Sequence, residues 1–139
     1  MKNSYFTIEE LCKSDTAERE HIDNTPSEEI KKRLQILIEF LNPLREAWGS
    51  GIRVNSGYRC PELNKAVGGV DTSAHKEGWA VDIYPVNNKF EDFKRFIIDY
   101  LKDKNFDQVI IERSGRSQWI HLGLYSNHRQ RKQIFKIEK

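Results

Sequence analysis

Cysteine, methionine and long apolar runs are scarce in this sequence of 139 residues, which has two cysteines and one methionine. The two cysteines, Cys12 and Cys60, are too few for a disulfide framework and lack the spacing of a cysteine metal site. No apolar run approaches the roughly 20 residues that a transmembrane helix needs, so we expect no membrane span. Residues 1–6 lack the apolar core of a signal peptide, and we therefore expect synthesis in the cytoplasm.

An excess of charge of one sign is also missing, because 23 lysines and arginines balance 21 aspartates and glutamates. The net charge of +2 does not indicate nucleic-acid binding, and no basic stripe is interleaved with aromatic residues. We expect the basic cluster 128–132 to be a solvated face, with a weak contact to an anionic polymer as the alternative. Charged residues make up 32% and hydrophobic residues 37% of the chain, which is typical of one globular domain, here residues 1–139.

Helix-start signals occur twice in the first third of the chain. Thr7 opens a capping box and predicts a short helix. Thr25 followed by Pro26 predicts the cap and the first residue of a long helix. This helix has an apolar stripe at helical spacing, formed by Ile30, Leu34, Leu37, Ile38, Leu41, Leu44 and Trp48. Pro43 should bend or interrupt it, because proline lacks an N–H donor and clashes with the preceding turn. The polar stretch 15–24 is expected to be a loop.

Later parts of the chain alternate like strands. The expected strands are 52–55, 79–84, 108–112, 119–125 and, at the edge, 133–137. Pro61 is expected to begin a short helix through Val67, and Asn87 or Asn88 to cap a second long helix. Residues 113–118 are expected to be a hairpin loop of six residues. Strands grouped with helices and joined by hairpins predict an α+β fold, with a small antiparallel sheet flanked by helices.

One histidine and one aspartate lie seven positions apart in the segment 73–82 and are separated by a glycine turn. His75 is expected in a loop, and Asp82 on a strand whose alternation turns it away from the apolar side chains. His121 has the same position in a later strand. Two imidazoles and one carboxylate are suitable zinc ligands. The alternatives are a solvated His75, an Asp82 bonded to backbone and a satisfied core histidine at position 121. A Cys60 nucleophile is a weaker alternative, because its surroundings do not resemble a cysteine peptidase signature.

These residues form the pattern Ser73-x-His75-x-x-Gly78-x-Ala80-x-Asp82, which is followed by Trp119-x-His121. On this pattern the chain resembles the zinc D-alanyl-D-alanine peptidase family, peptidase family M15, which shares its fold with the hedgehog signalling domain. The resemblance extends from about Phe6 to Tyr125 and includes Ser56-Gly57-Tyr58-Arg59. It implies that His75, Asp82 and His121 hold Zn²⁺ and leave one position for water.

A peptidase of this kind also needs a general base within hydrogen-bond reach of the attacking water. Relatives carry an acidic residue either close before the last histidine or further upstream, at the end of the preceding strand. The first position is Gln118 here, which cannot act as a base. Glu112 ends the preceding strand, and a hairpin that pairs Glu112 with Trp119 would place it diagonal to His121. We interpret Glu112 as the base, with an ion pair to a neighbouring arginine as the alternative.

The resemblance implies three substrate-binding residues. Arg59 would hold a substrate carbonyl or a terminal carboxylate, because guanidinium forks two hydrogen bonds onto one carboxylate. Its alternative is a surface arginine stacked on Tyr58. Ser73 would be a hydrogen-bond donor to the substrate or to a site residue, and not a nucleophile. Trp119 would form a wall of the cleft, with a role in the core as the alternative.

The resemblance therefore implies a zinc metallopeptidase that hydrolyses a peptide bond in peptidoglycan. It would be a D,D-carboxypeptidase or an endopeptidase of the stem peptide or cross-bridge. The expected partner is a peptidoglycan peptide, the cofactor is Zn²⁺, and we expect a monomer. The start of the chain fits a phage or prophage lysis enzyme, an endolysin, that acts on the cell wall after release. The alternative is a non-catalytic, zinc-stabilised module that binds cell wall or protein, and Gln118 keeps it open.

Overall fold

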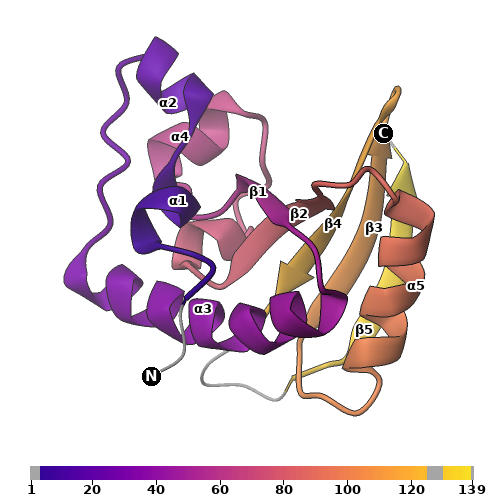
Figure 1. The fold of residues 1–139 in the computed structure, drawn as a ribbon. Helices are drawn as coiled ribbons and strands as arrows, with labels where there is room; N and C mark the ends of the chain where they lie inside the picture. Colours follow the sequence, from indigo (N-terminus) through magenta and orange to yellow (C-terminus); the bar gives the residue numbers. More distant parts are fainter. Residues whose placement is uncertain (1–3, 125–129, 139) are drawn as a thin grey trace.

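The structure is a computed structural model, and it describes residues 4–124 and 130–138 (Figure 1). Its strands are β1 (Ile52–Ser56), β2 (Ala80–Pro85), β3 (Gln108–Ser114), β4 (Ser117–Gly123) and β5 (Gln133–Glu138). Its helices are α1 (Ile8–Cys12), α2 (Asp15–Arg19), α3 (Glu28–Trp48), α4 (Pro61–Ala66), α5 (Phe90–Leu101) and the short 3₁₀ helix η1 (Ala74–Glu77). The predicted α+β class is confirmed.

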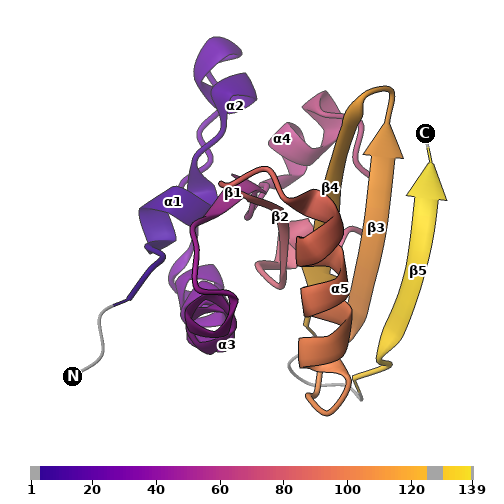
Figure 2. The same cartoon turned by 45° about the vertical axis from the view of Figure 1, so that its right-hand side comes forward.

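The five strands form one sheet in the order β1-β2-β4-β3-β5. The pairs β1–β2, β2–β4 and β3–β4 are antiparallel. β5 pairs in parallel with β3, and both run in the same direction in Figure 2. The predicted edge strand at 133–137 is therefore confirmed, and the sheet is mostly antiparallel. β4 ends at Gly123, whereas the expected strand continued to Tyr125, which lies outside the described residues.

The two faces of the sheet differ in chemistry because side chains alternate along each strand. One face packs with α3 and α5 into a single core cluster, whose fully buried members include Leu37, Phe93, Val81, Val109 and Leu122. Burying an aliphatic or aromatic side chain of this size stabilises the fold by about 1.5–3 kcal/mol. The opposite face carries Asp82, Glu112 and His121, and we call it the site face.

The start of α3 differs from the prediction. Its N-cap is Ser27, whose side chain accepts a hydrogen bond from the backbone N–H of Ile30 at 3.2 Å. The predicted cap, Thr25, lies outside the helix, and its hydroxyl donates to Asp23 at 2.6 Å. Thr25 and Ser27 both carry a hydroxyl and flank Pro26, so the sequence offers two similar helix-start signals. The predicted cap at Thr25 is wrong.

Pro43 lies inside α3 and the helix continues through it, so the helix is not interrupted there. An interior proline costs about 3 kcal/mol, because it removes one hydrogen bond and crowds the preceding turn. Its neighbours Leu41 and Leu44 are both 0% exposed, and burial of these side chains offsets that cost.

Neither α3 nor any other helix within the described residues has the length and hydropathy needed to cross a membrane.

Two other local predictions are wrong. Residues 15–24 were expected to be a loop, but Asp15–Arg19 form α2, whose N-cap Ser14 accepts from the N–H of Ala17. α2 forms because Ser14 caps it and Ala17 is buried against the rest of the protein. The N-cap of α5 is Lys89 and makes no side-chain capping bond. Asn87 instead accepts from the N–H of Lys89, ahead of the helix.

The β3–β4 hairpin is tighter than the predicted six-residue loop. Pairing continues to Ser114 and Ser117, so that Gly115 and Arg116 alone make the turn. Gly115 has φ 60°, which glycine adopts without strain and which two-residue hairpin turns require. The predicted pairing of Glu112 with Trp119 is confirmed.

Replacing Ser27 by alanine should lower the free energy of unfolding by about 0.5–2 kcal/mol, because α3 loses the oxygen that accepts from Ile30. Thr25→Ala is the matched control and should cost less, since Thr25 does not cap the helix. Urea denaturation of both variants and the wild type measures the difference. A larger loss for Thr25→Ala would contradict the cap at Ser27.

Candidate metal centre

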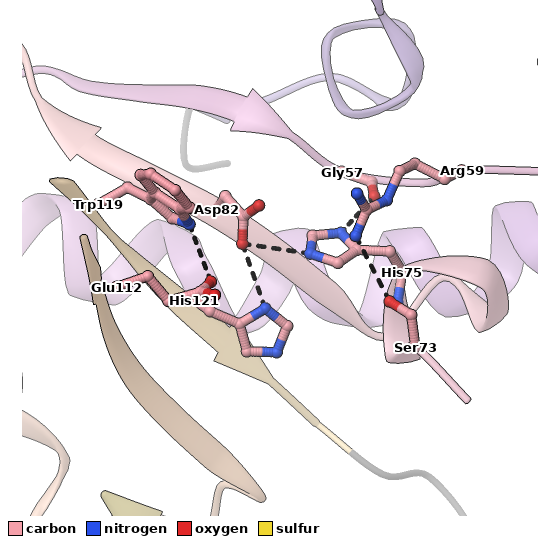
Figure 3. Close-up of polar contacts among 8 residues, drawn as sticks. All are labelled: Gly57, Arg59, Ser73, His75, Asp82, Glu112, Trp119 and His121. Carbon is pink, nitrogen blue, oxygen red and sulfur yellow. Dashed lines mark hydrogen bonds and ion pairs between the residues drawn. The ribbon is translucent and has the colours of Figure 1, made fainter. Parts of the chain in front are cut away.

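Three side chains that are distant in the sequence meet on the site face (Figure 3). Asp82 in β2 pairs directly with His121 in β4, so both side chains point to the same side of the sheet. His75 comes from η1, which Ser73 caps and which ends at Gly78 with φ 79°. The expected loop around His75 is therefore a short 3₁₀ helix that leads into β2. We call His75, Asp82 and His121 the triad.

Asp82 is the centre of the triad. Its Oδ1 lies 3.1 Å from Nε2 of His75 and 3.2 Å from Nδ1 of His121. The two imidazole rings are 5.0 Å apart between centroids and nearly perpendicular. One potential ligand atom from each residue lies within 4.8 Å of the other two. The side chains of His75, Asp82 and His121 are only 2%, 15% and 11% exposed.

The hydrogen bonding of His75 favours a cation at this place. Its Nδ1 donates to the carbonyl oxygen of Gly57 at 2.7 Å, because a carbonyl can only accept. A neutral His75 would then direct its Nε2 lone pair at the Asp82 carboxylate, and the two groups would repel each other. Either a proton or a metal ion between the two atoms removes this repulsion. A backbone acceptor on the far nitrogen is also the usual support of a metal-bound histidine.

The spacing of the triad also fits zinc. Ligands about 2.0–2.2 Å from a tetrahedral zinc ion lie roughly 3.3 Å from one another. The separations of Asp82 Oδ1 from the two ring nitrogens, 3.1 and 3.2 Å, are close to this value. Nitrogen and carboxylate oxygen are the donors that zinc accepts in catalytic sites with three protein ligands. The residues present therefore fit a zinc ion in both chemistry and spacing.

The electrostatics of the triad keep Asp82 ionised. Burial by itself would raise the pKa of Asp82. The charge of His75 and the hydrogen bonds from His121 and His75 outweigh this effect and hold the pKa of Asp82 well below its ordinary value. An ionised carboxylate is the form that binds a metal ion, so Asp82 is ready to act as a ligand.

A pocket of about 680 Å³ surrounds the triad. One wall is the segment 67–74 between α4 and η1, and the other is formed by β3 and β5. Every site residue predicted from the sequence lines this site pocket, namely Arg59, Ser73, His75, Asp82, Glu112, Trp119 and His121. The structure thus brings all of the predicted residues to one place.

Glu112 lies on the site face, diagonal to His121, and is 8% exposed. Its Oε2 accepts a hydrogen bond from Nε1 of Trp119 at 2.9 Å, which fixes the carboxylate against the indole (Figure 3). Trp119 therefore both lines the pocket and orients Glu112. Gln118 pairs with Arg113 and accepts from its guanidinium, so alternation places both on the opposite face of the hairpin.

Arg59 and Ser73 lie beside the triad. The Nη2 of Arg59 donates to Oγ of Ser73 at 3.4 Å, and the same Oγ accepts from the backbone N–H of His75. Burial lowers the pKa of Arg59, while the carboxylates of Asp82 and Glu112 act in the opposite direction. The Nε of Arg59 is buried and has no hydrogen-bond partner among the described residues. A buried donor of this kind in a pocket is suited to an anionic ligand.

Gly57 orients His75, a role that the sequence did not reveal. A Cβ at this position would lie 2.1 Å from the carbonyl oxygen of Leu11, so no side chain fits. The N–H of Tyr58 donates to the same carbonyl at 2.7 Å and holds the segment in place. The sequence predicted only a turn at Ser56–Gly57, because the contact with Leu11 depends on the packing of α1.

Asn24 is a second structural support that no local pattern indicated. Its Nδ2 donates to the carbonyls of Cys12 and Tyr58, and its Oδ1 accepts from the N–H of Cys60. It thereby fixes the backbone on both sides of Arg59. Cys60 itself caps α4 through Sγ and is absent from the pocket lining, which does not support a cysteine nucleophile.

Arg131 and Lys132 of the basic cluster 128–132 are exposed, as expected of a solvated face, and Arg131 also forms an ion pair. Its Nε and Nη2 donate to the two carboxylate oxygens of Asp107, each at 2.8 Å, and Arg131 lines the site pocket. Asp107 is 2% exposed and lies just before β3. His128 and Arg129 of the same cluster lie outside the described residues.

Comparison with protein families places the chain in a known family. The sequence model of a family described as Peptidase M15 matches residues 4–123. Comparison with curated proteins finds no match. The matched region includes the triad and every other predicted site residue, and it ends with β4, ahead of β5.

Replacing His75, Asp82 or His121 by alanine should weaken zinc binding at least about a hundredfold, more than the loss of an outer-shell partner costs. Each change removes one of the three potential ligand atoms. His21→Ala is the matched control, because His21 is exposed and belongs to a different part of the chain. Isothermal titration calorimetry with zinc chloride measures the affinities. Unchanged affinity in all three variants would exclude the triad as the zinc site.

Proposed function

This chain belongs to the peptidase M15 family, and we propose that it is a zinc-dependent peptidase that cleaves a peptide bond in peptidoglycan. The bond is either the terminal D-alanyl-D-alanine bond or a bond within the stem peptide or cross-bridge. The observation that carries the proposal is the convergence of His75, Asp82 and His121 beside Glu112 in one pocket. Release by a phage or prophage during lysis is the biological setting that we propose.

His75, Asp82 and His121 would hold the zinc ion. When bound, zinc supplies Lewis acidity, which activates a water molecule and polarises a carbonyl group. The backbone carbonyl of Gly57 keeps the Nδ1 proton of His75 in place, so its Nε2 is free to face the ion. The pairing of β2 with β4 holds Asp82 and His121 opposite each other. The positions that the backbone gives to these three side chains support their role as ligands.

Glu112 would accept a proton from the attacking water and deliver it to the amine that leaves. Its position diagonal to His121 on the site face supports this role. The indole N–H of Trp119 holds one carboxylate oxygen of Glu112, which directs the group within the pocket. Because Gln118 lies on the opposite face, an acidic residue at that position is not needed for this arrangement.

Arg59 would bind the carboxylate or carbonyl of the substrate on the side of the pocket next to His75. Its buried Nε has no partner among the described residues, and Ser73 accepts from its Nη2. A substrate carboxylate would satisfy the buried donor and gain charge-assisted hydrogen bonds. This anchor would place the scissile carbonyl near the triad. The backbone of Arg59 is held next to His75, because the backbone N–H of Arg59 donates to the carbonyl oxygen of His75 at 3.1 Å.

Incubation of the zinc-loaded protein with defined muropeptides should release an amino acid or a peptide, detected by mass spectrometry. A chelator should abolish the product. Glu112→Gln should still bind zinc but lose about 10²–10⁴-fold in kcat, since general acid–base catalysis contributes that much. The matched control is Glu91→Gln, which changes an exposed glutamate of α5 that pairs with Lys94.

The outcomes separate the proposal from its alternative. Muropeptides that stay intact with zinc-loaded protein, but bind to it, would favour a zinc-stabilised binding module. Full turnover by Glu112→Gln would remove Glu112 from the role of base and leave the peptidase itself standing. Turnover that survives complete removal of zinc would contradict the zinc-dependent mechanism.

A further inference from the structure

The segment 67–74, which forms one wall of the site pocket, begins at a compact helix end after α4. The N–H of Gly68 donates to the carbonyl of Lys65 at 3.1 Å, and Gly68 has φ 77°. The N–H of Gly69 donates to the carbonyl of Asn64 at 2.8 Å. These two bonds and the left-handed glycine form a Schellman motif, in which the residue at the place of Asn64 is usually apolar and packs against the chain just beyond the helix.

Asn64 puts a polar side chain in that place. It is 2% exposed, and its Nδ2 donates to the carbonyl of Val70 at 2.9 Å, while its Oδ1 has no hydrogen-bond partner among the described residues. A Cβ on Gly69 would lie 2.2 Å from this Oδ1, so only glycine lets the chain pass so close to Asn64. Burying an amide costs free energy that an apolar residue would avoid, so the bond to Val70 points to a role beyond ending the helix.

The carbonyl of Val70 connects Asn64 with the substrate side of the pocket. It also accepts from the backbone N–H of Ser73 at 3.0 Å, since a carbonyl oxygen has two lone pairs. The Oγ of Ser73 in turn accepts from Nη2 of Arg59 at 3.4 Å (Figure 3) and from the backbone N–H of His75 at 3.2 Å. Asn64 is therefore linked to the proposed substrate anchor through Val70 and Ser73.

The triad is held mainly by other contacts. Nδ1 of His75 donates to the carbonyl of Gly57. Asp82 pairs with His121 across β2 and β4. Neither contact involves the segment 67–74, so a change in that segment should affect substrate binding more than metal binding.

We propose that Asn64 is a positioning residue that sets the affinity for the substrate by holding the segment 67–74 and its Ser73 in place. Val70 is 68% exposed, so burial of its side chain contributes little to fixing the segment. The bond from Asn64 fixes the wall before the substrate arrives, and this reduces the conformational freedom that is lost on binding. The inference rests on the proposed function, because it gives Asn64 a part in binding the substrate of that site.

Two variants remove the donor of Asn64. Asn64→Asp keeps the shape of the side chain and places a carboxylate oxygen where the N–H was. Asn64→Ala removes the donor without adding a charge, and it replaces the first variant if the carboxylate prevents folding. Lys65→Ala is the matched control, because Lys65 is an exposed residue of the same helix. Hydrogen exchange followed by mass spectrometry should be faster over residues 69–73 in the Asn64 variants and unchanged in the control.

Calorimetry then separates substrate binding from metal binding. Each change is also made in Glu112→Gln protein, so that a tripeptide ending in D-alanyl-D-alanine binds to the zinc-loaded protein without being cleaved. We expect its affinity to fall about tenfold in the Asn64 variants, the usual size of the loss of one hydrogen bond. Zinc affinity should change less than about threefold, below the loss that an outer-shell partner of a metal ligand causes. In the otherwise wild-type protein, KM should rise while kcat changes little.

The results distinguish the two proposals. A loss of zinc affinity as large as the loss of peptide affinity would overturn the role of Asn64, because Asn64 would then support the whole pocket and not its substrate side. Unchanged peptide affinity, or unchanged exchange over residues 69–73, would overturn it as well. Muropeptides that stay intact, although the tripeptide binds and does so more weakly in the Asn64 variants, would contradict the proposed function and leave the role of Asn64 in place.

Discussion

The contact of the largely buried Asp82 carboxylate with two imidazoles is the interaction on which the site depends. A buried charge is costly unless it is paired, and Asp82 has His75 and His121 on its Oδ1 within 3.2 Å. The direct pairing of β2 with β4 sets the contact of Asp82 with His121. The carbonyl of Gly57 orients the ring of His75, which makes the other contact. The sheet and the segment after β1 therefore have to be in place before these three side chains can come together.

The support for this arrangement extends well beyond the triad. Gly57 approaches Leu11 so closely that only glycine fits, and Asn24 holds the backbone around Arg59 through three hydrogen bonds. On the other side of the pocket, the Trp119 indole fixes Glu112. The residues proposed as substrate anchor, general base and metal ligands are thus placed by backbone contacts and by single hydrogen bonds, which gives a preorganised pocket on the sheet.

Sequence reasoning was sufficient where a short-range rule decides the structure. The alternation of apolar and polar residues predicted which face Asp82 and His121 share, and the register of Glu112 with Trp119 followed from the simplest hairpin. It failed where two signals compete or where packing decides. Thr25 and Ser27 offer similar caps, buried leucines override Pro43, and the contact of Gly57 with Leu11 exists only in the folded chain. The ion pair of Arg131 with Asp107 likewise joins segments that no local pattern connects.

The proposed mechanism requires one divalent ion between His75, Asp82 and His121. Anomalous X-ray diffraction at the zinc absorption edge, on crystals grown with zinc, locates such an ion. We expect one strong anomalous peak about 2.0–2.2 Å from a ring nitrogen of each histidine and from an oxygen of Asp82. A zinc ion bound elsewhere, with these three side chains still in direct contact with one another, would contradict it.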